Sequence, residues 1–238
     1  MSAESYPPLA KLRDPQQRIK RQGHTLWHLQ LFTQERITDL AKSKSAMRDI
    51  DIRRTLLADQ RLHRGEPDTR VVEELGLCQG LARVDVAVVN GTLHGYEIKS
   101  ERDTLDRLPH QAELYSRVLD YVTVVAASPH TQKIRTAVPQ WWGVWTAASE
   151  NGVLRLDVSR EAKRNPSVDP FSLAQLLWRD EALEILVESE LASGMRSKSR
   201  KEIWKVLATK FSVEVLGRLV RERVKNRGSN WRVVSRQE

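Results

Sequence analysis

The chain has a single cysteine, Cys78, among its 238 residues. One thiol can form neither an intramolecular disulfide nor a cysteine-based zinc site, so both are excluded. The sequence also lacks a basic start followed by an apolar run, and it lacks the roughly 18–20 consecutive apolar residues that span a membrane. We therefore expect a cytoplasmic protein with no signal peptide and no membrane segment.

Several catalytic motifs are absent as well. The sequence has no glycine-rich loop of the kind that cradles phosphate groups, no Ser/His/Asp triad and no helicase motif. Any unwinding of a nucleic acid would therefore need another protein. What the chain has in excess is positive charge, with 39 Lys and Arg against 31 Asp and Glu, for a formal net charge of +8.

The positive charge is concentrated near the C-terminus. Residues 195–238 contain 13 Lys or Arg and four Asp or Glu, and this surplus of nine accounts for the whole net charge. Apolar residues recur at helical spacing in the same stretch, so the basic side chains are expected on helices. Basic helices favour a nucleic acid as partner, and a merely solvated basic surface is the alternative.

Periodicity divides the chain into three parts. We predict a polar extension over residues 1–45 with one amphipathic helix at 25–42, a compact core over 46–150, and a basic helical module over 151–238. The predicted core consists of a helix at 49–63, strands at 69–75, 81–89 and 92–99, a helix at 102–121, a strand at 122–127, a helix at 131–138 and a strand at 143–148. The predicted helices of the module cover 172–191, 198–210 and 213–227.

This order of elements predicts the fold class. Three consecutive strands favour an antiparallel meander, and the helix that follows them brings the chain back to a parallel neighbour. We therefore expect an α/β protein with a mixed central sheet flanked by helices, followed by a C-terminal basic helical extension.

The most informative segment is a pair of predicted strands joined by Asn90-Gly91, a dipeptide that strongly favours a β-hairpin. Asp85 lies on the first strand, and Glu97 and Lys99 lie on the second, separated by one apolar residue. Two carboxylates that share a divalent metal, with an ammonium group beside them, can support hydrolysis of a phosphodiester bond.

The register of this hairpin decides whether the two acids meet. A two-residue loop would place them on opposite faces of the sheet. A three-residue loop, with a positive φ at Gly91, pairs Val89 with Leu93 and sets the acids side by side; a bulge at Gly95 has the same effect. We predict one of these two devices. In that register one face carries Val84, Val86, Val88, Tyr96 and Ile98, and the other carries Asp85, Ala87, Gly95, Glu97 and Lys99, where the small residues leave room for a ligand.

The hairpin resembles the signature of the PD-(D/E)XK nuclease superfamily. Asp85 matches the first acid of that signature, and Glu97-Ile98-Lys99 matches its (D/E)XK element. Val84 stands where the name of the superfamily has Pro. The order of predicted elements is also that of the superfamily core, so the resemblance implies a restriction-endonuclease-like fold.

A second motif extends the resemblance. Gln111 and Tyr115 are similar to the Gln-x-x-x-Tyr motif of the RecB-like exonuclease branch. The similarity covers roughly residues 49–148, and residues 71–111 also resemble a bacterial and phage family of largely undefined role. Because the two side chains lie one helical turn apart, they are expected to lean over the site and to touch Lys99 or a substrate phosphate.

The resemblance implies a catalytic site for Mg²⁺, which Mn²⁺ can replace. Asp85 and Glu97 would bind the ion, and the main-chain carbonyl of Ile98 would complete its shell. Lys99 would orient or deprotonate the nucleophile, or stabilise the charge of the transition state. Members of the superfamily usually add an upstream acid, for which Glu74 is favoured over Asp51.

The sequence thus predicts a Mg²⁺-dependent nuclease that acts on DNA, as an endonuclease or an exonuclease. The alternatives are an RNA-directed or toxin and defence nuclease, and a catalytically inactive nucleic-acid-binding protein. A second copy of the chain, giving a homodimer, and a helicase or other protein are further candidate partners. The basic residues expected to hold backbone phosphates are Arg102, Arg107, Lys198, Arg200, Lys201, Arg221 and Arg223.

Overall fold

The computed structural model describes residues 46–63 and 68–228. The predicted N-terminal extension, including its helix at 25–42, lies outside the described residues. The described residues all fall within one compact unit. In this part of the chain, no helix has the length and apolar character needed to cross a membrane.

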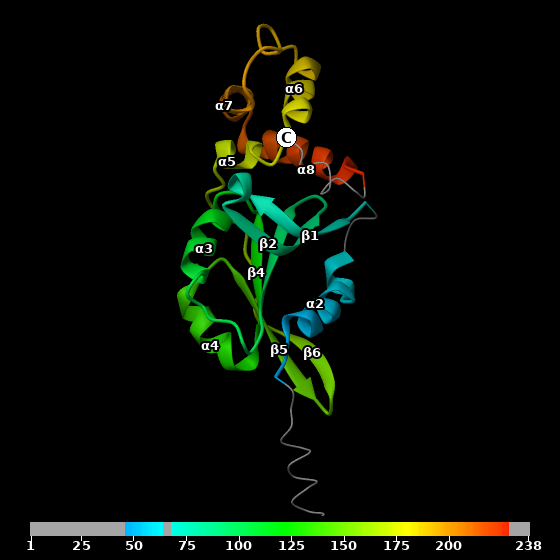
Figure 1. Cartoon of the computed structure of the whole chain (residues 1–238), viewed down its shortest axis with the longest axis vertical. Helices are drawn as coiled ribbons and strands as arrows, with labels where there is room; N and C mark the ends of the chain where they lie inside the picture. Colours follow the sequence, from blue (N-terminus) through cyan, green and yellow to red (C-terminus); the bar gives the residue numbers. More distant parts are fainter. Residues whose placement is uncertain (1–45, 64–67, 229–238) are drawn as a thin grey trace, which may run out of the picture. The chain divides into compact units, whose positions relative to one another are not determined.

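A six-stranded mixed sheet organises the described residues (Figure 1). In chain order its strands are β1 (Arg70–Leu77), β2 (Ala82–Val89), β3 (Leu93–Lys99), β4 (Tyr121–Ala127), β5 (Gly143–Glu150) and β6 (Val153–Arg160). The first three strands form an antiparallel meander, β3, β4 and β5 are parallel, and β6 is antiparallel to β5. The predicted α/β class and mixed sheet are therefore confirmed.

Helices cover both faces of the sheet (Figure 1). The helix α2 (Asp49–Leu57), followed by a short 3-10 helix (Gln60–His63), buries Ile52 and Leu56 against one face. The helices α3 (Leu108–Ser116) and α4 (Ser128–Ala137) pack on the other face. The central strand β4 is apolar along nearly its whole length, as expected for a strand covered on both sides.

Four helices complete the chain: α5 (Pro170–Ala174), α6 (Arg179–Glu188), α7 (Arg200–Lys210) and α8 (Val213–Asn226). They lie together near the end of the sheet formed by β1 and β2 (Figure 1). Their buried residues, including Leu173, Ile185 and Trp204, belong to the same hydrophobic cluster as α3 and one face of the sheet. The C-terminal helices and the sheet thus share one core.

The sheet extends beyond the boundary that the sequence predicts at residue 150. Asn151 and Gly152 both have positive φ values, 51° and 80°, as in the tight hairpin turn that Asn-Gly favours. The following strand β6 pairs with β5, so the sheet continues into the segment that the sequence predicts as the helical module. In β6 few side chains are buried, so its sequence predicts a strand less clearly than the continuous apolar run of β4 does.

Two predicted helices are also shorter than expected. The helix predicted over 102–121 covers only Leu108–Ser116, because Pro109 in its first turn favours a helix start there. The helix predicted over 172–191 is interrupted after Ala174 and resumes at Arg179. Arg102 consequently lies in a turn after β3 and not on a helix.

Candidate functional site

The β2–β3 hairpin has the register that brings the two acids together. Val89 pairs with Leu93, so the loop contains three residues, as predicted. The loop is closed by Asn90, whose Oδ1 accepts hydrogen bonds from the main-chain N–H of Thr92 at 3.0 Å and from its hydroxyl at 3.1 Å. A positive φ at Gly91 stays a prediction.

Asp85 lies in a fork between the two strands. The ladder of paired residues ends at Val86 and Tyr96, one position before Asp85 and Glu97. Beyond that point the carboxylate of Asp85 accepts a hydrogen bond from the main-chain N–H of Ile98 at 2.7 Å. The side chain of Asp85 therefore replaces a main-chain partner and is held within the fork.

The fork changes which residues face each core layer. Val84 belongs to the cluster that includes Leu119, whereas Val86 belongs to the cluster on the opposite face. A Cβ atom on Gly95 would lie 2.5 Å from Leu119 Cδ1 and 3.1 Å from Val84 Cγ2. The prediction that Val84 faces the same layer as Val86 is wrong, and the space over Gly95 holds these side chains, not a ligand.

Glu97 is the centre of a buried hydrogen-bond network. Its Oε1 accepts from Lys99 Nζ and from Gln111 Nε2, each at 2.6 Å, and its Oε2 accepts from the hydroxyl of Tyr115 at 2.6 Å. The ammonium of Lys99 also donates to Gln111 Oε1 at 3.2 Å. The side chains of Glu97 and Lys99 are only 4% and 5% exposed. The structure therefore brings together four of the residues that the sequence singled out.

The helix α3 holds this network against the sheet. Gln111 and Tyr115 lie one turn apart on α3, and both reach the same carboxylate on β3. Burial, followed by the negative charge of Glu97, raises the pKa of Tyr115. The phenol consequently stays neutral and acts as a hydrogen-bond donor to Glu97.

A second ion cluster surrounds Asp85 and was missed by the sequence analysis. Arg53, on α2, donates from Nη2 to Asp85 Oδ1 at 3.0 Å and lies 3.1 Å from Glu74 Oε1. Arg83 Nε lies 2.9 Å from the other oxygen of Glu74. No local sequence pattern indicates that Arg53 belongs to the site, because Glu74 and Asp85 lie on strands more than 20 positions further along the chain.

Of the two candidates for an upstream acid, Glu74 is the one near the site. It lies between the pairs Glu73–Val86 and Leu75–Val84, and is therefore opposite Asp85 in the sheet. The carboxylate of Asp51 instead binds Arg48 within α2 and its cap.

The pKa of Asp85 is raised far above that of an ordinary aspartate. Burial, and then the negative charge of Glu97, raise its pKa to about 7, although Arg53 and the N–H of Ile98 act in the opposite direction. The negative charges of Asp85 and Glu97 are therefore only partly balanced by neighbouring positive charge. Carboxylate oxygens are also the ligands that Mg²⁺ prefers. Within residues 46–63 and 68–228, no group of three or more acidic, His or Cys side chains is arranged to hold an ion. An ion at Asp85 and Glu97 would thus need water or phosphate oxygens as further ligands.

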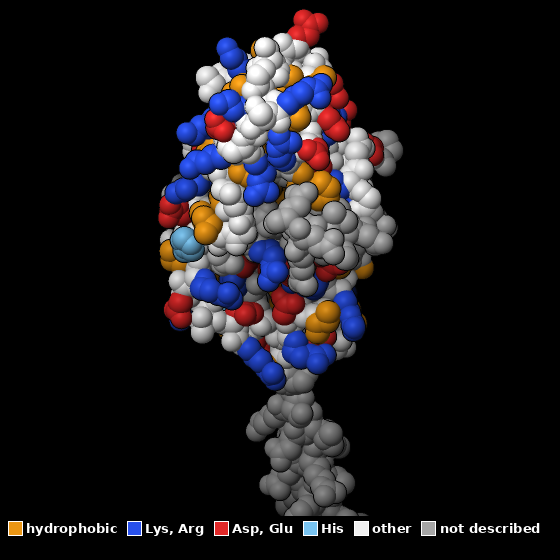
Figure 2. Space-filling model, turned by 45° about the horizontal axis from the view of Figure 1, so that its top comes forward, with side chains coloured by type: hydrophobic (Ala, Val, Ile, Leu, Met, Phe, Trp, Pro, Cys, Tyr) orange, Lys and Arg blue, Asp and Glu red, His pale blue; other side chains and the backbone are white. Residues whose placement is uncertain are grey.

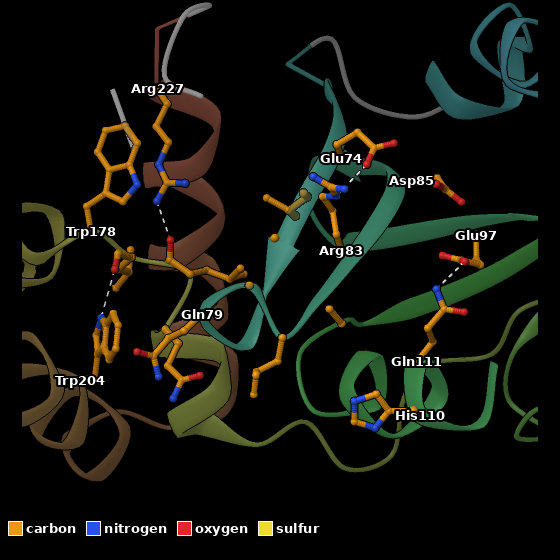
Figure 3. Close-up of a pocket in the computed structure, with 18 of the residues that line it drawn as sticks. Glu74, Gln79, Arg83, Asp85, Glu97, His110, Gln111, Trp178, Trp204 and Arg227 are labelled. Atoms are coloured by element: carbon orange, nitrogen blue, oxygen red, sulfur yellow. Dashed lines mark hydrogen bonds and ion pairs between the residues drawn. The ribbon is translucent and has the colours of Figure 1, made fainter. Parts of the chain in front are cut away.

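These acids line a pocket of about 1100 Å³. Figure 3 shows Asp85, Glu97, Gln111 and His110 at one end of the pocket and Trp178, Trp204 and Arg227 on the helical side. Glu74 and Arg83, from the β1–β2 hairpin, lie between the two groups. The C-terminal helices therefore supply a wall that faces the acids.

The predicted phosphate-binding residues have different surroundings. Arg107, at the start of α3, and Arg200, at the start of α7, both line the pocket and are exposed. Arg102 is exposed but does not line the pocket. Lys201, on α7, is exposed, and Lys198, just before α7, lies 3.2 Å from Glu202; neither lines the pocket. Figure 2 shows Lys and Arg side chains gathered over this end of the molecule, with acidic side chains among them.

Arg221 and Arg223 are bound within the protein. Arg221 Nη1 lies 3.2 Å from Asp120 Oδ2, which links α8 to the start of β4. Arg223 Nη2 donates to both carboxylate oxygens of Glu188 at 2.6 Å, which links α8 to α6. The guanidinium groups of these two residues are therefore engaged in ion pairs between elements of the fold.

The comparisons with known proteins point to one phage family. A sequence profile described as Bacteriophage P4 protein cII matches residues 42–237. Protein cII of Enterobacteria phage P4 is 26% identical over 160 residues, which make up 67% of this chain and 60% of the relative. The match thus spans less than two thirds of that relative. A protein of unknown function from Silicibacter pomeroyi is similar in structure, with 18% identity, 76% of this chain and 95% of that chain covered, and a TM-score of 0.37, which is too low to support a conclusion.

Proposed function

This chain belongs to the family of bacteriophage P4 protein cII, and for this member we propose a metal-dependent nuclease that hydrolyses phosphodiester bonds of DNA. The observation that carries the proposal is the hairpin register, which sets Asp85 beside Glu97 with Lys99 bound to Glu97. The order of strands and helices is compatible with the PD-(D/E)XK core that the sequence motif resembles. Both acids also line a pocket that is open to a substrate.

The two acids have the properties that a metal site requires. Asp85 and Glu97 would hold a divalent ion, for which Mg²⁺ is the natural choice because both donors are carboxylate oxygens. When bound, the ion lowers the pKa of a water molecule and neutralises charge on the phosphate. Glu74, opposite Asp85 on β1, is the third acid at this end of the pocket.

Lys99 has the surroundings of a residue placed for catalysis. Its ammonium has three donors, of which two have partners among the described residues, Glu97 and Gln111. The third has no partner among the described residues, and we propose that it donates to a water molecule or a phosphate oxygen, although Lys99 itself does not line the pocket. Because the ammonium is buried, its charge acts in a low dielectric, where it stabilises developing negative charge more strongly than in water.

The direct test is a cleavage assay with the purified full-length protein. Supercoiled plasmid, linear duplex, single-stranded DNA and RNA are each incubated with Mg²⁺ or Mn²⁺. Asp85→Asn and Glu97→Gln should each lower DNA cleavage by about 100-fold or more, the usual effect of removing a group that stabilises the transition state. Glu113→Gln, an exposed change on α3, is the matched control and should leave the rate unchanged.

The outcome can contradict the proposal in two ways. Cleavage that survives both Asp85→Asn and Glu97→Gln would place the chemistry elsewhere. A wild-type protein that cuts none of the four substrates with either metal would favour a nucleic-acid-binding role. Circular dichroism of each variant separates lost activity from lost folding.

A further inference from the structure

The loop between β1 and β2 presents an apolar side chain at the rim of the pocket. Its residues Cys78, Gln79 and Gly80 all have left-handed backbones, with φ values of 50°, 58° and 86°. Leu81 follows and is 73% exposed, although it lines the same pocket as Asp85 and Glu97. A single exposed leucine is ordinary on a protein surface, so its position at the pocket rim is what matters here.

The loop is anchored at its base. Cys78 is buried, with its thiol 4.0 Å from the main-chain carbonyl of Leu114 on α3. The N–H of Leu81 donates to the carbonyl of Cys78 at 3.3 Å, which closes the turn. Left-handed backbone at non-glycine residues costs roughly 1–2 kcal/mol each, and it persists where the surroundings hold it. Leu81 is therefore held outward by a fixed turn.

Two arginines line the pocket from different elements. Arg107 begins α3 and Arg200 begins α7, and both are exposed where they line the pocket. Neither forms an ion pair in the part of the chain that the structure describes, in contrast to Arg83 and Arg53, which bind the acids. The pocket thus has acids at one end, Arg107 at the start of α3, and Arg200 over the ring of Trp204, 4.8 Å from its centroid, on the helical side. This distribution suits a phosphate chain that extends from the acids toward the helical side.

The size of the pocket limits what it can hold. About 1100 Å³ is close to the upper range for a site that encloses a single small molecule. Such a space accommodates a few unpaired nucleotides, whereas a duplex would have to stay outside it. The wall that imposes this limit comes from the C-terminal helices, through Trp178 and Trp204 (Figure 3). Arg200 lines the pocket as well.

We propose that the pocket takes the unpaired strand of a DNA junction, with Arg107 and Arg200 on its phosphates and Leu81 against the last base pair of the adjoining duplex. Apolar side chains, leucine among them, are known to insert between base steps in this way. The proposal deepens the nuclease function given above and rests on it for the cleavage step. The strand binding itself does not depend on a metal.

The geometry also predicts where the strand is cut. Leu81 immediately precedes β2, in which Asp85 is the fourth residue, so the two residues lie at most about 13 Å apart at roughly 3.3 Å per residue. Stacked bases are about 3.4 Å apart along one strand. Cleavage should therefore fall within about four nucleotides of the junction between paired and unpaired DNA.

Binding is tested without divalent metal, in EDTA, with the full-length protein and fluorescently labelled DNA. A forked duplex, a blunt duplex and a single strand of the same sequence are compared by anisotropy. The fork should bind at least tenfold more tightly than the blunt duplex. Arg107→Gln and Arg200→Gln should each weaken single-strand binding and lower the salt slope by about 0.7. Arg218→Gln, an exposed change on α8 outside the pocket, is the control.

The role of Leu81 is tested with 2-aminopurine at the last paired position of the fork. Wild-type protein should raise its fluorescence by unstacking the base, and Leu81→Ser should abolish this rise while single-strand affinity stays unchanged. Val153→Ser is the matched control, because Val153, the first residue of β6, is 60% exposed and does not line the pocket.

Two results would overturn the proposal. One is a blunt duplex that binds as tightly as the fork, and the other is a Leu81→Ser variant that behaves like Val153→Ser. If the fork binds as expected but is never cut with Mg²⁺ or Mn²⁺, the nuclease function fails while the strand site stands. If DNA is cut at positions unrelated to the junction, the strand site fails while the nuclease function stands.

Discussion

Arg53 and Asp85 are joined by two hydrogen bonds from a single guanidinium, one to the carboxylate and one to the main-chain carbonyl, each at 3.0 Å. The same group lies 3.1 Å from Glu74. The side chain of Arg53 is only 12% exposed, so its charge is poorly screened by water. Arg53 therefore supplies positive charge at the point where acids of β1 and β2 meet.

This relationship predicts that Arg53 competes with a metal ion. Arg53→Gln should lower the melting temperature without metal, because Asp85 and Glu74 lose their shared cation. The same change should raise Mg²⁺ affinity by roughly tenfold or more, since a hydrogen bond between charged groups contributes about 1.5–3 kcal/mol. Isothermal titration calorimetry measures the affinity, and melting curves with increasing Mg²⁺ measure the linked stabilisation.

Arg54→Gln is the control for this experiment, because Arg54 is the exposed neighbour of Arg53 on the same helix. It should alter neither the Mg²⁺ affinity nor the melting temperature appreciably. If Arg53→Gln weakened Mg²⁺ binding, Arg53 would be a support for the acids and not a competitor for them.

The raised pKa of Asp85 predicts a specific pH dependence of stability. The group titrates at about 7 in the folded protein against an ordinary value of 3.8, so the folded state holds more protons between these values. Its contribution to stability should therefore fall as pH rises from about 4 to 7, by up to about 1.4 kcal/mol per pH unit, and level off above 7. Asp85→Asn removes this dependence.

Melting temperatures of the two proteins in EDTA, measured from pH 4 to pH 9, test this prediction. The variant should become more stable relative to the wild type as pH rises to 7. Acids remote from Asp85 affect both proteins alike, so the difference between the curves reports on Asp85 together with Glu97, whose charge acts on it. Two parallel curves would contradict the prediction.

The buried pair of Glu97 and Lys99 predicts a strong coupling between the two residues. Lys99→Met leaves the carboxylate of Glu97 buried without its cation and should lower the free energy of unfolding by about 3–5 kcal/mol. The double variant Glu97→Gln/Lys99→Met removes both charges and should recover much of this loss. Urea denaturation measures both effects. Equal stability of the single and double variants would show that the pair is not coupled.

Both of these variants should be inactive in DNA cleavage, for different reasons. The single variant loses the ammonium, and the double variant also loses a metal ligand. The double variant is the more informative, because a folded and inactive protein assigns the loss to chemistry. Glu113→Gln again controls for changes on α3 that do not touch the network.

Variants of Arg221 and Arg107 should distinguish an arginine that stabilises the fold from one that binds DNA. Arg221 is mostly buried against Asp120, which also accepts a hydrogen bond from the N–H of Leu93 at 2.8 Å. Arg221→Gln should therefore lower stability by about 1–3 kcal/mol and leave single-strand affinity unchanged. Arg107→Gln should do the reverse. Chemical denaturation and anisotropy on the same preparations decide the matter, and a loss of DNA affinity in Arg221→Gln would contradict this assignment.

The β2–β3 hairpin shows which features of the site can be predicted from local sequence. A one-residue slip in pairing moves every side chain to the other face, so burial of one face restricts the register to few choices. The pairing of Val89 with Leu93 could therefore be predicted. The placement of Gln111 and Tyr115 toward one carboxylate follows in the same way from helical spacing.

Other features depended on contacts between distant segments. Val84 faces a different layer from Val86 because the strands separate at Asp85, and the sequence contains no sign of that fork. The dipeptide Asn151-Gly152 is typical of a hairpin turn before β6. The apolar and polar residues of β6 alternate only weakly, however, so the sequence alone does not predict its pairing with β5.

The sequence by itself determined the mixed sheet, the register of the acidic hairpin and the helix that covers it, because each follows from periodicity within a short window. Only the tertiary structure decided that Arg53 binds the acids, that Arg221 and Arg223 serve the fold, and that the C-terminal helices wall the pocket. Those outcomes depend on which charged groups and apolar faces become neighbours after the chain has folded. Neither spacing nor composition specifies such long-range pairings.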